Sequence, residues 1–173
     1  SLKSVEEEYD DLKTKYEDIE TLIDMAQEDE DTDLIEEATA LMDEFETKYE
    51  ELRISTLLTG EYDKDDAILT LHAGAGGTES CDWAGMLYRM FTRWAYKKGY
   101  GTEVLDYLDG DEAGIKSVTV KISGMNAYGY LRSEKGVHRL VRISPFNAAG
   151  KRQTSFASCD VMPDIKDDIE VEI

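Results

Sequence analysis

Apolar residues in the N-terminal third of the chain recur at alternating spacings of three and four. The first series is Leu2, Val5, Tyr9, Leu12, Tyr16, Ile19, Ile23 and Ala26, and the second is Ile35, Ala38, Met42, Phe45, Tyr49 and Leu52. Such spacing places the apolar side chains along one side of an α-helix, as in supercoiled helices. The acidic run 28–33 separates the two series. Residues 1–60 are therefore predicted to form an antiparallel α-helical hairpin, which a third helix from elsewhere would complete into a bundle.

From residue 61 onward the pattern changes to short apolar runs that are typical of strands. The predicted strands are 67–73, 102–108, 115–123, 137–143, 154–161 and 169–173. One long helical pattern follows the glycine-rich turn 74–77 and ends near Gly99, with Thr78 as its candidate N-terminal cap. The chain is therefore predicted to be an α+β protein. Its second domain, residues 61–173, is a mixed sheet module with one long helix packed on it, and we expect this domain to be incomplete at its C-terminus.

Charge is distributed unevenly along the chain. The formal net charge is −20, with −19 in residues 1–70, whereas residues 116–152 hold eight Lys or Arg against one acid, Glu134, a net of +7. Lys and Arg supply much of the affinity for nucleic acids by neutralising phosphates. The N-terminal acidity is interpreted as a solvated helix surface, and the basic segment as a candidate RNA-binding region.

Several classes of protein find no support in the composition. No run of about 18 uncharged apolar residues and no secretory signal is present, so a cytoplasmic, soluble protein is expected. Cys81 and Cys159 lack the spacing of a zinc site or a disulfide framework. The glycine-rich turn lacks the Lys-Ser or Lys-Thr of a phosphate-binding loop, and the two histidines have no catalytic partner at a telling spacing. We therefore expect no metal, no cofactor and no enzymatic activity of this chain.

A basic strand leads into a short loop at Ser144-Pro145-Phe146. Proline fixes φ in such a loop, phenylalanine offers a face for base stacking, and a serine hydroxyl can donate or accept a hydrogen bond. A base-reading loop is one interpretation. A hairpin turn with a buried phenylalanine is the other, and the residues alone leave both open.

Several segments resemble the bacterial peptide chain release factors over essentially the whole chain. They are Gly-Gly-Thr-Glu at 76–79, Asp-Trp-Ala at 82–84, Ala-Gly-Ile-Lys-Ser at 113–117, Gly-Val-His-Arg-Leu at 136–140, Ser-Pro-Phe at 144–146 and Arg-Gln-Thr-Ser-Phe at 152–156. Ser-Pro-Phe is similar to the tripeptide of the class that reads UAA and UGA, whereas the other class has Pro-x-Thr. The resemblance implies a function in translation termination. It also implies that the acidic hairpin is the N-terminal domain and that the sheet module binds the stop codon in the decoding centre.

The resemblance also implies roles for individual residues. The backbone at Gly76 and Glu79 would read the first-position uracil, and the hydroxyl of Ser144, with Pro145 and Phe146 shaping its loop, would read the second base. A hydroxyl serves both adenine and guanine, because it can accept from an amino group or donate to a carbonyl.

Val141 and Thr154 would face the third base, where an apolar wall leaves a guanine edge unpaired at a cost of roughly 1 to 3 kcal/mol. Where the family usually has a histidine that stacks on the codon, this chain has Gln153. The candidate contacts to the RNA backbone are Lys116, Arg139, Arg142, Lys151 and Arg152.

The family's partners would be the ribosome, its ribosomal RNA and the stop codon of messenger RNA, together with the recycling GTPase release factor, and neither a membrane nor DNA. By resemblance, the Gly-Gly-Gln domain that triggers peptide release would follow residue 173, and a further helix would precede residue 1. Two alternatives stay open. One is a coiled-coil adaptor associated with the ribosome, and the other is a rescue factor without codon specificity, which Gln153 favours.

Overall fold

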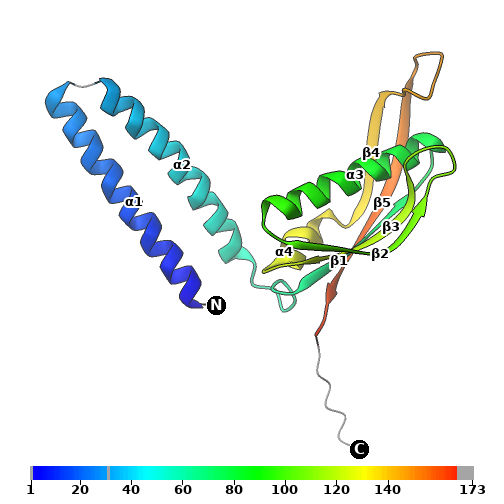
Figure 1. The fold of residues 1–173 in the computed structure, drawn as a ribbon, viewed down its shortest axis with the longest axis horizontal. Coiled ribbons are helices and arrows are strands. Elements are labelled where there is room, and N and C mark those ends of the chain that lie inside the picture. The colour runs from blue at the N-terminus through cyan, green and yellow to red at the C-terminus, as the bar shows by residue number, and fades with distance from the viewer. Residues whose placement is uncertain (1, 31, 167–173) are drawn as a thin grey trace, which may run out of the picture. The chain divides into compact units, whose positions relative to one another are not determined.

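The computed structural model describes residues 2–30 and 32–166. The chain divides into two compact units, residues 1–57 and 58–173, each of which is described by itself (Figure 1). The sequence placed this division three residues later, between 60 and 61. The predicted strand at 169–173 lies outside the described residues.

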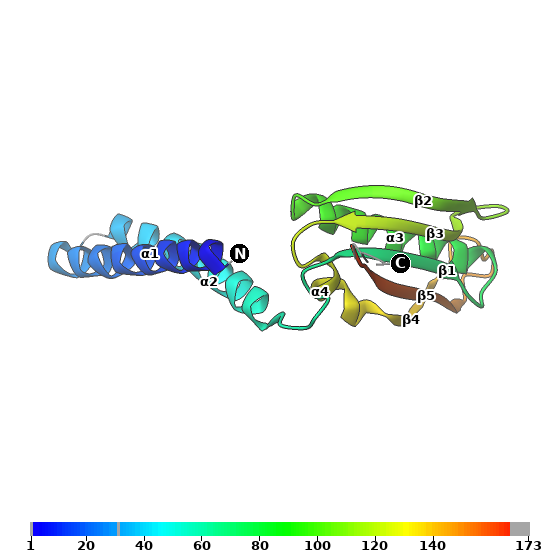
Figure 2. The ribbon, with the colours of Figure 1, turned by 90° about the horizontal axis from the view of Figure 1, so that it is seen from below.

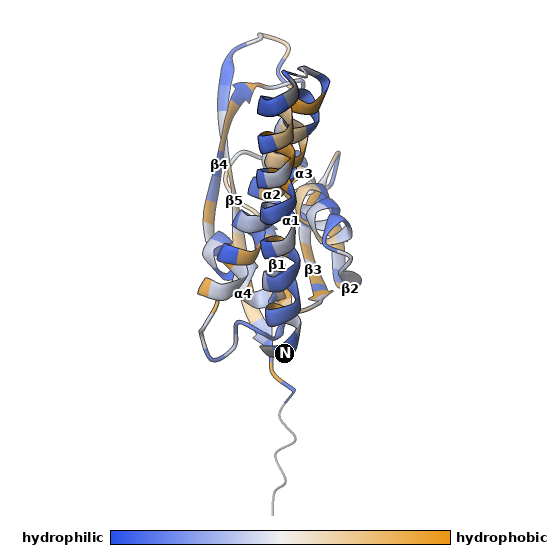
Figure 3. Cartoon of the chain, turned by 90° about the vertical axis from the view of Figure 1, so that its left-hand side faces the viewer, coloured by the Kyte–Doolittle hydropathy of each residue, from blue (hydrophilic) through white to orange (hydrophobic). Residues whose placement is uncertain are grey.

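The first unit is a hairpin of two helices, α1 (Leu2–Asp29) and α2 (Thr32–Leu57). Its contact side is narrow, and the buried apolar residues among those described are Leu12, Ile19, Ala26 and Ala38. Most other positions are polar, and Figure 3 accordingly colours α1 mainly as hydrophilic. The predicted hairpin is confirmed. Residues 2–30 and 32–57 contain no third helix, so the completed bundle stays a prediction.

The second unit contains a five-stranded sheet. Its strands are β1 (Asp66–Ala73), β2 (Gly101–Asp109), β3 (Ile115–Ser123), β4 (Gly136–Ile143) and β5 (Arg152–Asp164). Their order across the sheet is β2-β3-β1-β5-β4, and Figure 2 shows them side by side with α3 behind them. All four pairings among the described residues are antiparallel, so the prediction of a mixed sheet is wrong. The reason is that β3 lies between β1 and β2, which run in the same direction and would otherwise have paired in parallel.

The long helix α3 (Thr78–Lys97) covers one face of this sheet. Alternate residues of the central strands, such as Leu69 and Val120, are fully buried against Leu87 and Phe91 of the helix. The strands at these apolar runs and the helical spacing in α3 are what the sequence pattern predicted, and the strands bury every second residue. Trp83 adds a polar link, because its Nε1 donates a hydrogen bond to the carbonyl of His138 in β4 at 3.1 Å.

The start of α3 differs from the prediction. Gly77, with φ 60°, is the N-cap residue, and no side chain caps the helix. Thr78 instead donates a hydrogen bond to Glu112 at 3.1 Å, and Ser80 donates to the carbonyls of Gly74 and Gly77. A threonine cap requires extended backbone at that residue, whereas here the chain turns at the preceding glycine, which has a positive φ.

Two short helical segments were not predicted. They are α4 (Ala127–Leu131) and the 3-10 turn η1 (Arg132–Glu134), which connect β3 to β4. They span too few residues to show a helical repeat, and α4 begins after Asn126 in a left-handed conformation with φ 63°.

The sheet has two edge strands, β2 and β4. Every residue of β2 is exposed, including four large apolar side chains. These are Val104, Leu105, Tyr107 and Leu108. Among residues 2–30 and 32–166, no helix is long and apolar enough to cross a membrane.

Candidate nucleic-acid interface

Four segments from two distant regions of the sequence meet at one end of the sheet. They are the glycine-rich turn 74–77, the first turn of α3, the loop 144–147 after β4, and the start of β5. Gly74 donates its N–H to the carbonyl of Phe156 at 2.8 Å, and Phe156 donates to the carbonyl of Ala75 at 3.1 Å. The glycine-rich turn therefore continues the sheet beside β5, next to the residues that the sequence assigned to base reading.

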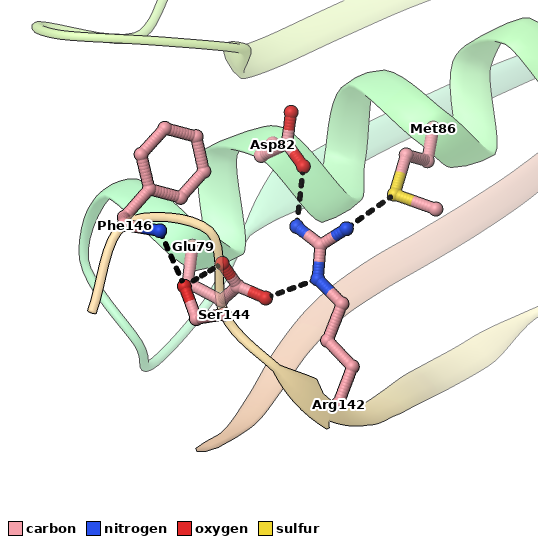
Figure 4. A network of polar contacts seen from close by, with 6 residues as sticks. All are labelled: Glu79, Asp82, Met86, Arg142, Ser144 and Phe146. Atoms are coloured by element: carbon pink, nitrogen blue, oxygen red, sulfur yellow. Dashed lines mark hydrogen bonds and ion pairs between the residues drawn. The ribbon is translucent and has the colours of Figure 1, made fainter. Parts of the chain in front are cut away.

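Arg142 joins β4 to α3 through two carboxylates (Figure 4). Its Nε donates to Glu79 at 2.5 Å and its Nη2 donates to Asp82 at 2.5 Å, while Nη1 contacts the sulfur of Met86 at 3.7 Å. The hydrogen bond from Arg142 holds the pKa of Glu79 below its ordinary value, and the bond from Ser144 adds to this although burial opposes it. The carboxylates in turn raise the pKa of Arg142. This network of charge-assisted bonds fixes the end of β4 on the first turn of α3.

Ser144 is buried in the same network, with 4% of its surface exposed. Its hydroxyl donates to the other oxygen of Glu79 at 2.5 Å and accepts the N–H of Phe146 at 3.1 Å. A hydroxyl has one proton and two lone pairs, so one lone pair is left. The sequence predicted a hydroxyl that can either donate or accept, whereas in this structure the proton of Ser144 is donated to Glu79.

The tip of the loop is exposed. Pro145 and Phe146 both face solvent, and 49% of the surface of Phe146 is accessible. The ring is therefore available for stacking on a base, as the sequence suggested for this residue type, and it is not buried as in the alternative hairpin-turn interpretation.

Gly76, in the glycine-rich turn, lies against Ser155 of β5. Its φ is 131°, and a Cβ at this position would lie 2.7 Å from the Oγ of Ser155. Glycine is required here both by the conformation and by the close approach of the two segments. The residue itself is exposed, so its backbone groups are open to a ligand.

Three further predicted residues lie on the β4–β5 ladder. Val141 and Thr154 are direct cross-strand partners, and both are exposed. Gln153, also exposed, is the partner of Arg142. Because directly opposite residues share a face of the sheet, Val141 and Thr154 form one surface, as their assignment to a single base requires.

The basic segment is partly neutralised within the chain. Of its eight cations, four form ion pairs with acidic residues of the second unit. These pairs are Lys121 with Asp164, Arg132 with Asp63, Lys135 with Asp160, and Arg142 with Glu79. Arg142 is thus not free to bind a phosphate, contrary to its assignment. The remaining candidates have exposed side chains and no ion pair among the described residues; they are Lys116, Arg139, Lys151 and Arg152.

Within the part of the chain that the structure describes, no group of three or more His, Cys, Asp or Glu residues could hold a metal ion. The chemistry available is hydrogen bonding by backbone and hydroxyl groups, stacking on Phe146, and contact of exposed cations with phosphates.

The chain belongs to the family defined by the PCRF domain, whose model matches residues 1–159. Among individual proteins it is similar to peptide chain release factor 2, as the motifs in the sequence indicated. It is 51% identical to the factor of Exiguobacterium sp. over 99% of this chain, and 55% identical to that of Clostridium perfringens over 96%. The chain spans about half the length of these curated relatives, 47% and 46% respectively.

A solved structure agrees with this assignment. RF2 of Thermus thermophilus superposes with a TM-score of 0.68 at 43% identity, covering 94% of this chain and 46% of that one. The α+β fold class expected from the sequence is confirmed by this likeness and by the observed elements.

Proposed function

We propose that this chain is the codon-recognition part of a translation termination factor that reads UAA and UGA on the ribosome. The observation that supports this most is the convergence of the 144–147 loop, the glycine-rich turn and the start of β5 on the first turn of α3. One polar network holds these segments, so an exposed reading surface is preorganised on a rigid base.

The reading surface offers a different chemistry for each base. Backbone groups at Gly76 and the first turn of α3 suit a small first-position uracil. At the second position the lone pair left on Ser144 can accept a hydrogen bond from the amino group of adenine, and its proton would have to leave Glu79 to donate to the carbonyl of guanine. At the third position the apolar wall of Val141 beside Thr154 leaves the polar edge of a guanine unpaired. UAG is thereby rejected, while UAA and UGA are accepted.

The remaining partners follow from charge. The unpaired cations Lys116, Arg139, Lys151 and Arg152 would bind ribosomal RNA near the codon. The acidic hairpin would not bind RNA and is available to a protein such as the recycling GTPase release factor. We assign the triggering of peptide release to the part of the relatives' length that this chain does not span.

The test is binding of this chain to ribosomes programmed with UAA, UGA, UAG or a sense codon. We expect UAA and UGA to be preferred over UAG by about 5- to 150-fold, which is the 1 to 3 kcal/mol cost of an unpaired polar edge. Replacing Ser144-Pro145-Phe146 with Pro-Ala-Thr should weaken binding to UGA relative to UAA, because the tripeptide faces the second base, whereas Val141 and Thr154 should still reject UAG. A matched control is Asn147-Ala148-Ala149 changed to Ser-Ser-Ser, which alters the same loop beyond the tripeptide.

Equal binding to all four codons would overturn codon reading. It would favour instead a ribosome-associated protein without codon specificity, which the exposed amide of Gln153, in place of the family's histidine, permits. Changing Gln153 to His then separates the two cases, since better stacking on a codon should strengthen binding to stop codons alone.

A further inference from the structure

The stretch 83–102, which contains α3 from Trp83 onward and the turn that follows it, departs from the composition of the rest of the chain. More than one residue in five of the whole chain is acidic, 39 of 173, yet residues 83–102 contain no acid. The same stretch contains four cations, Arg89, Arg93, Lys97 and Lys98. In a chain with a net charge of −20, residues 83–102 therefore carry a local net charge of +4.

Three of these residues, Arg89, Arg93 and Lys97, form a row that we call the α3 cations. They are four residues apart, which places them on the same side of the helix about 6 Å from one another along its axis. All three are exposed, whereas the side of α3 that packs on the sheet carries buried residues such as Leu87 and Phe91. The row therefore points away from the sheet.

No carboxylate of the described residues forms an ion pair with the α3 cations. The acids at the start of α3, Glu79 and Asp82, are both bound by Arg142. Lys98 differs from the row, because its Nζ lies 4.5 Å from the centre of the Tyr130 ring.

The neighbouring acidic strand β2 directs two of its carboxylates elsewhere. Glu103 and Asp106 are register partners of Lys121 and Thr119 in β3. Those two residues alternate with Val118, Val120 and Ile122, which are buried beneath α3. Because successive residues of a strand face opposite sides, these acids lie on the face that α3 does not cover.

An aromatic side chain lies beside the row. Tyr96 is adjacent to Lys97 and is 84% exposed. A large ring in water contributes nothing to the packing of the protein. Tyrosine next to arginine and lysine is typical of surfaces that bind nucleic acids, because the ring can stack or pack while the cations neutralise phosphates.

We propose that the α3 cations bind the phosphate backbone of RNA and form a contact separate from the loop 144–147. This inference rests on the proposed function, since the RNA would be ribosomal RNA beside the decoding site. Phosphates repeat regularly along a strand, as the row does, and two of its three members are arginines, whose planar fork suits a phosphate. The first turn of α3 lies beside the loop 144–147, because Ser144 is hydrogen-bonded to Glu79. An RNA strand near the loop can therefore continue along the helix.

The test uses the whole 173-residue chain with Arg89, Arg93 and Lys97 all changed to Gln. The matched control changes Lys3, Lys13 and Lys64 to Gln, which removes the same charge from three exposed lysines without ion pairs among the described residues. Binding to ribosomes programmed with UAA and with UAG is measured at several salt concentrations. Glutamine forms helices well, and the fluorescence of Trp83 and Trp94, both on α3, reports whether the helix is intact.

We expect the α3 variant to bind both kinds of ribosome about tenfold or more weakly, with an unchanged ratio of UAA to UAG. The slope of log affinity against log salt should fall by about 2 to 3, at 0.7 to 0.9 per lost phosphate contact, while the control keeps the slope of the unaltered chain.

An α3 variant that keeps the affinity and the slope of the control would overturn the inference and leave the row to an acidic protein partner. Codon reading is judged separately, by the ratio of UAA to UAG for the unaltered chain. A further outcome is that the unaltered chain binds UAA and UAG equally while the α3 variant shows a smaller salt dependence than the unaltered chain. This result would refute codon reading and support RNA binding by α3.

Discussion

Arg142 shows how the surroundings of a residue decide what its charge does. It lies on a strand with other basic residues, but its guanidinium is held by Glu79 and Asp82 of α3. Arg139, three residues earlier on the same strand, is exposed and has no ion pair among the described residues. The sequence could not separate the two, because the ion pair joins residues about 60 positions apart.

We predict that Arg142→Met destabilises the second unit by about 2 to 4 kcal/mol, since it leaves the buried carboxylate of Glu79 without its counterion. Arg139→Met is the matched control and should change the free energy of unfolding by less than about 0.5 kcal/mol. Urea unfolding followed by tryptophan fluorescence measures both, as the chain's two tryptophans lie in the second unit. Equal effects of the two substitutions would mean that the network contributes little stability.

Glu79 makes the stability of the second unit depend on pH. Its pKa is lowered in the folded state, chiefly by Arg142, from an ordinary value of 4.5. The carboxylate therefore contributes its full stabilisation above pH 4.5, and this contribution is lost as the pH falls through the folded pKa. The free energy of unfolding should exceed that of Glu79→Gln most at neutral pH, and the difference should shrink toward pH 3. Glu61→Gln, an exposed acid of the same unit, serves as the control.

For Ser144 the sequence predicted the position in the chain but not the surroundings of the side chain. Its place in the loop 144–147 followed from the tripeptide, and Val141 and Thr154, which the resemblance assigned to the same base, are cross-strand partners in the structure. Its burial and its bond to Glu79 did not follow, because they depend on how β4 crosses the first turn of α3.

At the scale of elements, the connection between β2 and β3 determines where α3 can begin. Gly114, in this connection, has φ 68°, and a Cβ there would lie 2.1 Å from the carbonyl oxygen of Cys81. The connection thus packs backbone against backbone on the first turn of α3, where Glu79 and Asp82 lie.

Two glycine substitutions separate conformation from packing. Gly150 has a similar φ of 63°, but nothing lies within 4 Å of its Cβ position. We expect Gly150→Ala to cost about 1 to 2 kcal/mol of unfolding free energy, the penalty for a left-handed residue. Gly114→Ala should cost roughly 1 to 3 kcal/mol more, because the first turn of α3 must move. Urea unfolding of both variants gives the difference, and similar losses would show that the contact is easily relieved.

The elements themselves were largely predictable. The alternation of apolar residues in β1 and β3, and the repeat of Leu87 and Phe91 in α3, reflect burial that the residues themselves dictate. The direction of pairing was not predictable, because strand order arises from contacts between distant segments. The first turn of α3 was misassigned, because a glycine with positive φ replaced the threonine cap.

At the scale of the whole molecule, the two units differ greatly in how much they bury. The described residues of the hairpin include four buried apolar side chains, and residues 1–57 carry a net charge of −16, whereas the second unit has a continuous core between α3 and the sheet. Self-repulsion and little burial both weaken a compact state.

We therefore predict two separate thermal transitions. Helix content, followed by circular dichroism, should begin to fall at a temperature at which the fluorescence of Trp83 and Trp94 in the second unit is still native. Added salt should raise the first transition more than the second, since it screens the charge of the hairpin. Coincident transitions at all salt concentrations would instead indicate that the units unfold cooperatively.

The exposed edge strand β2 affects how readily the protein aggregates at high concentration. An edge with four large apolar side chains could pair with the same strand of another copy and begin an aggregate. Glu103, Asp106 and Asp109 recur at every third position of β2. When two copies approach edge to edge, these carboxylates meet one another, and like charges on facing strands oppose pairing. Acidic residues thus have different effects in the two units. In the hairpin they weaken the folded state, and in β2 they oppose the association of two molecules.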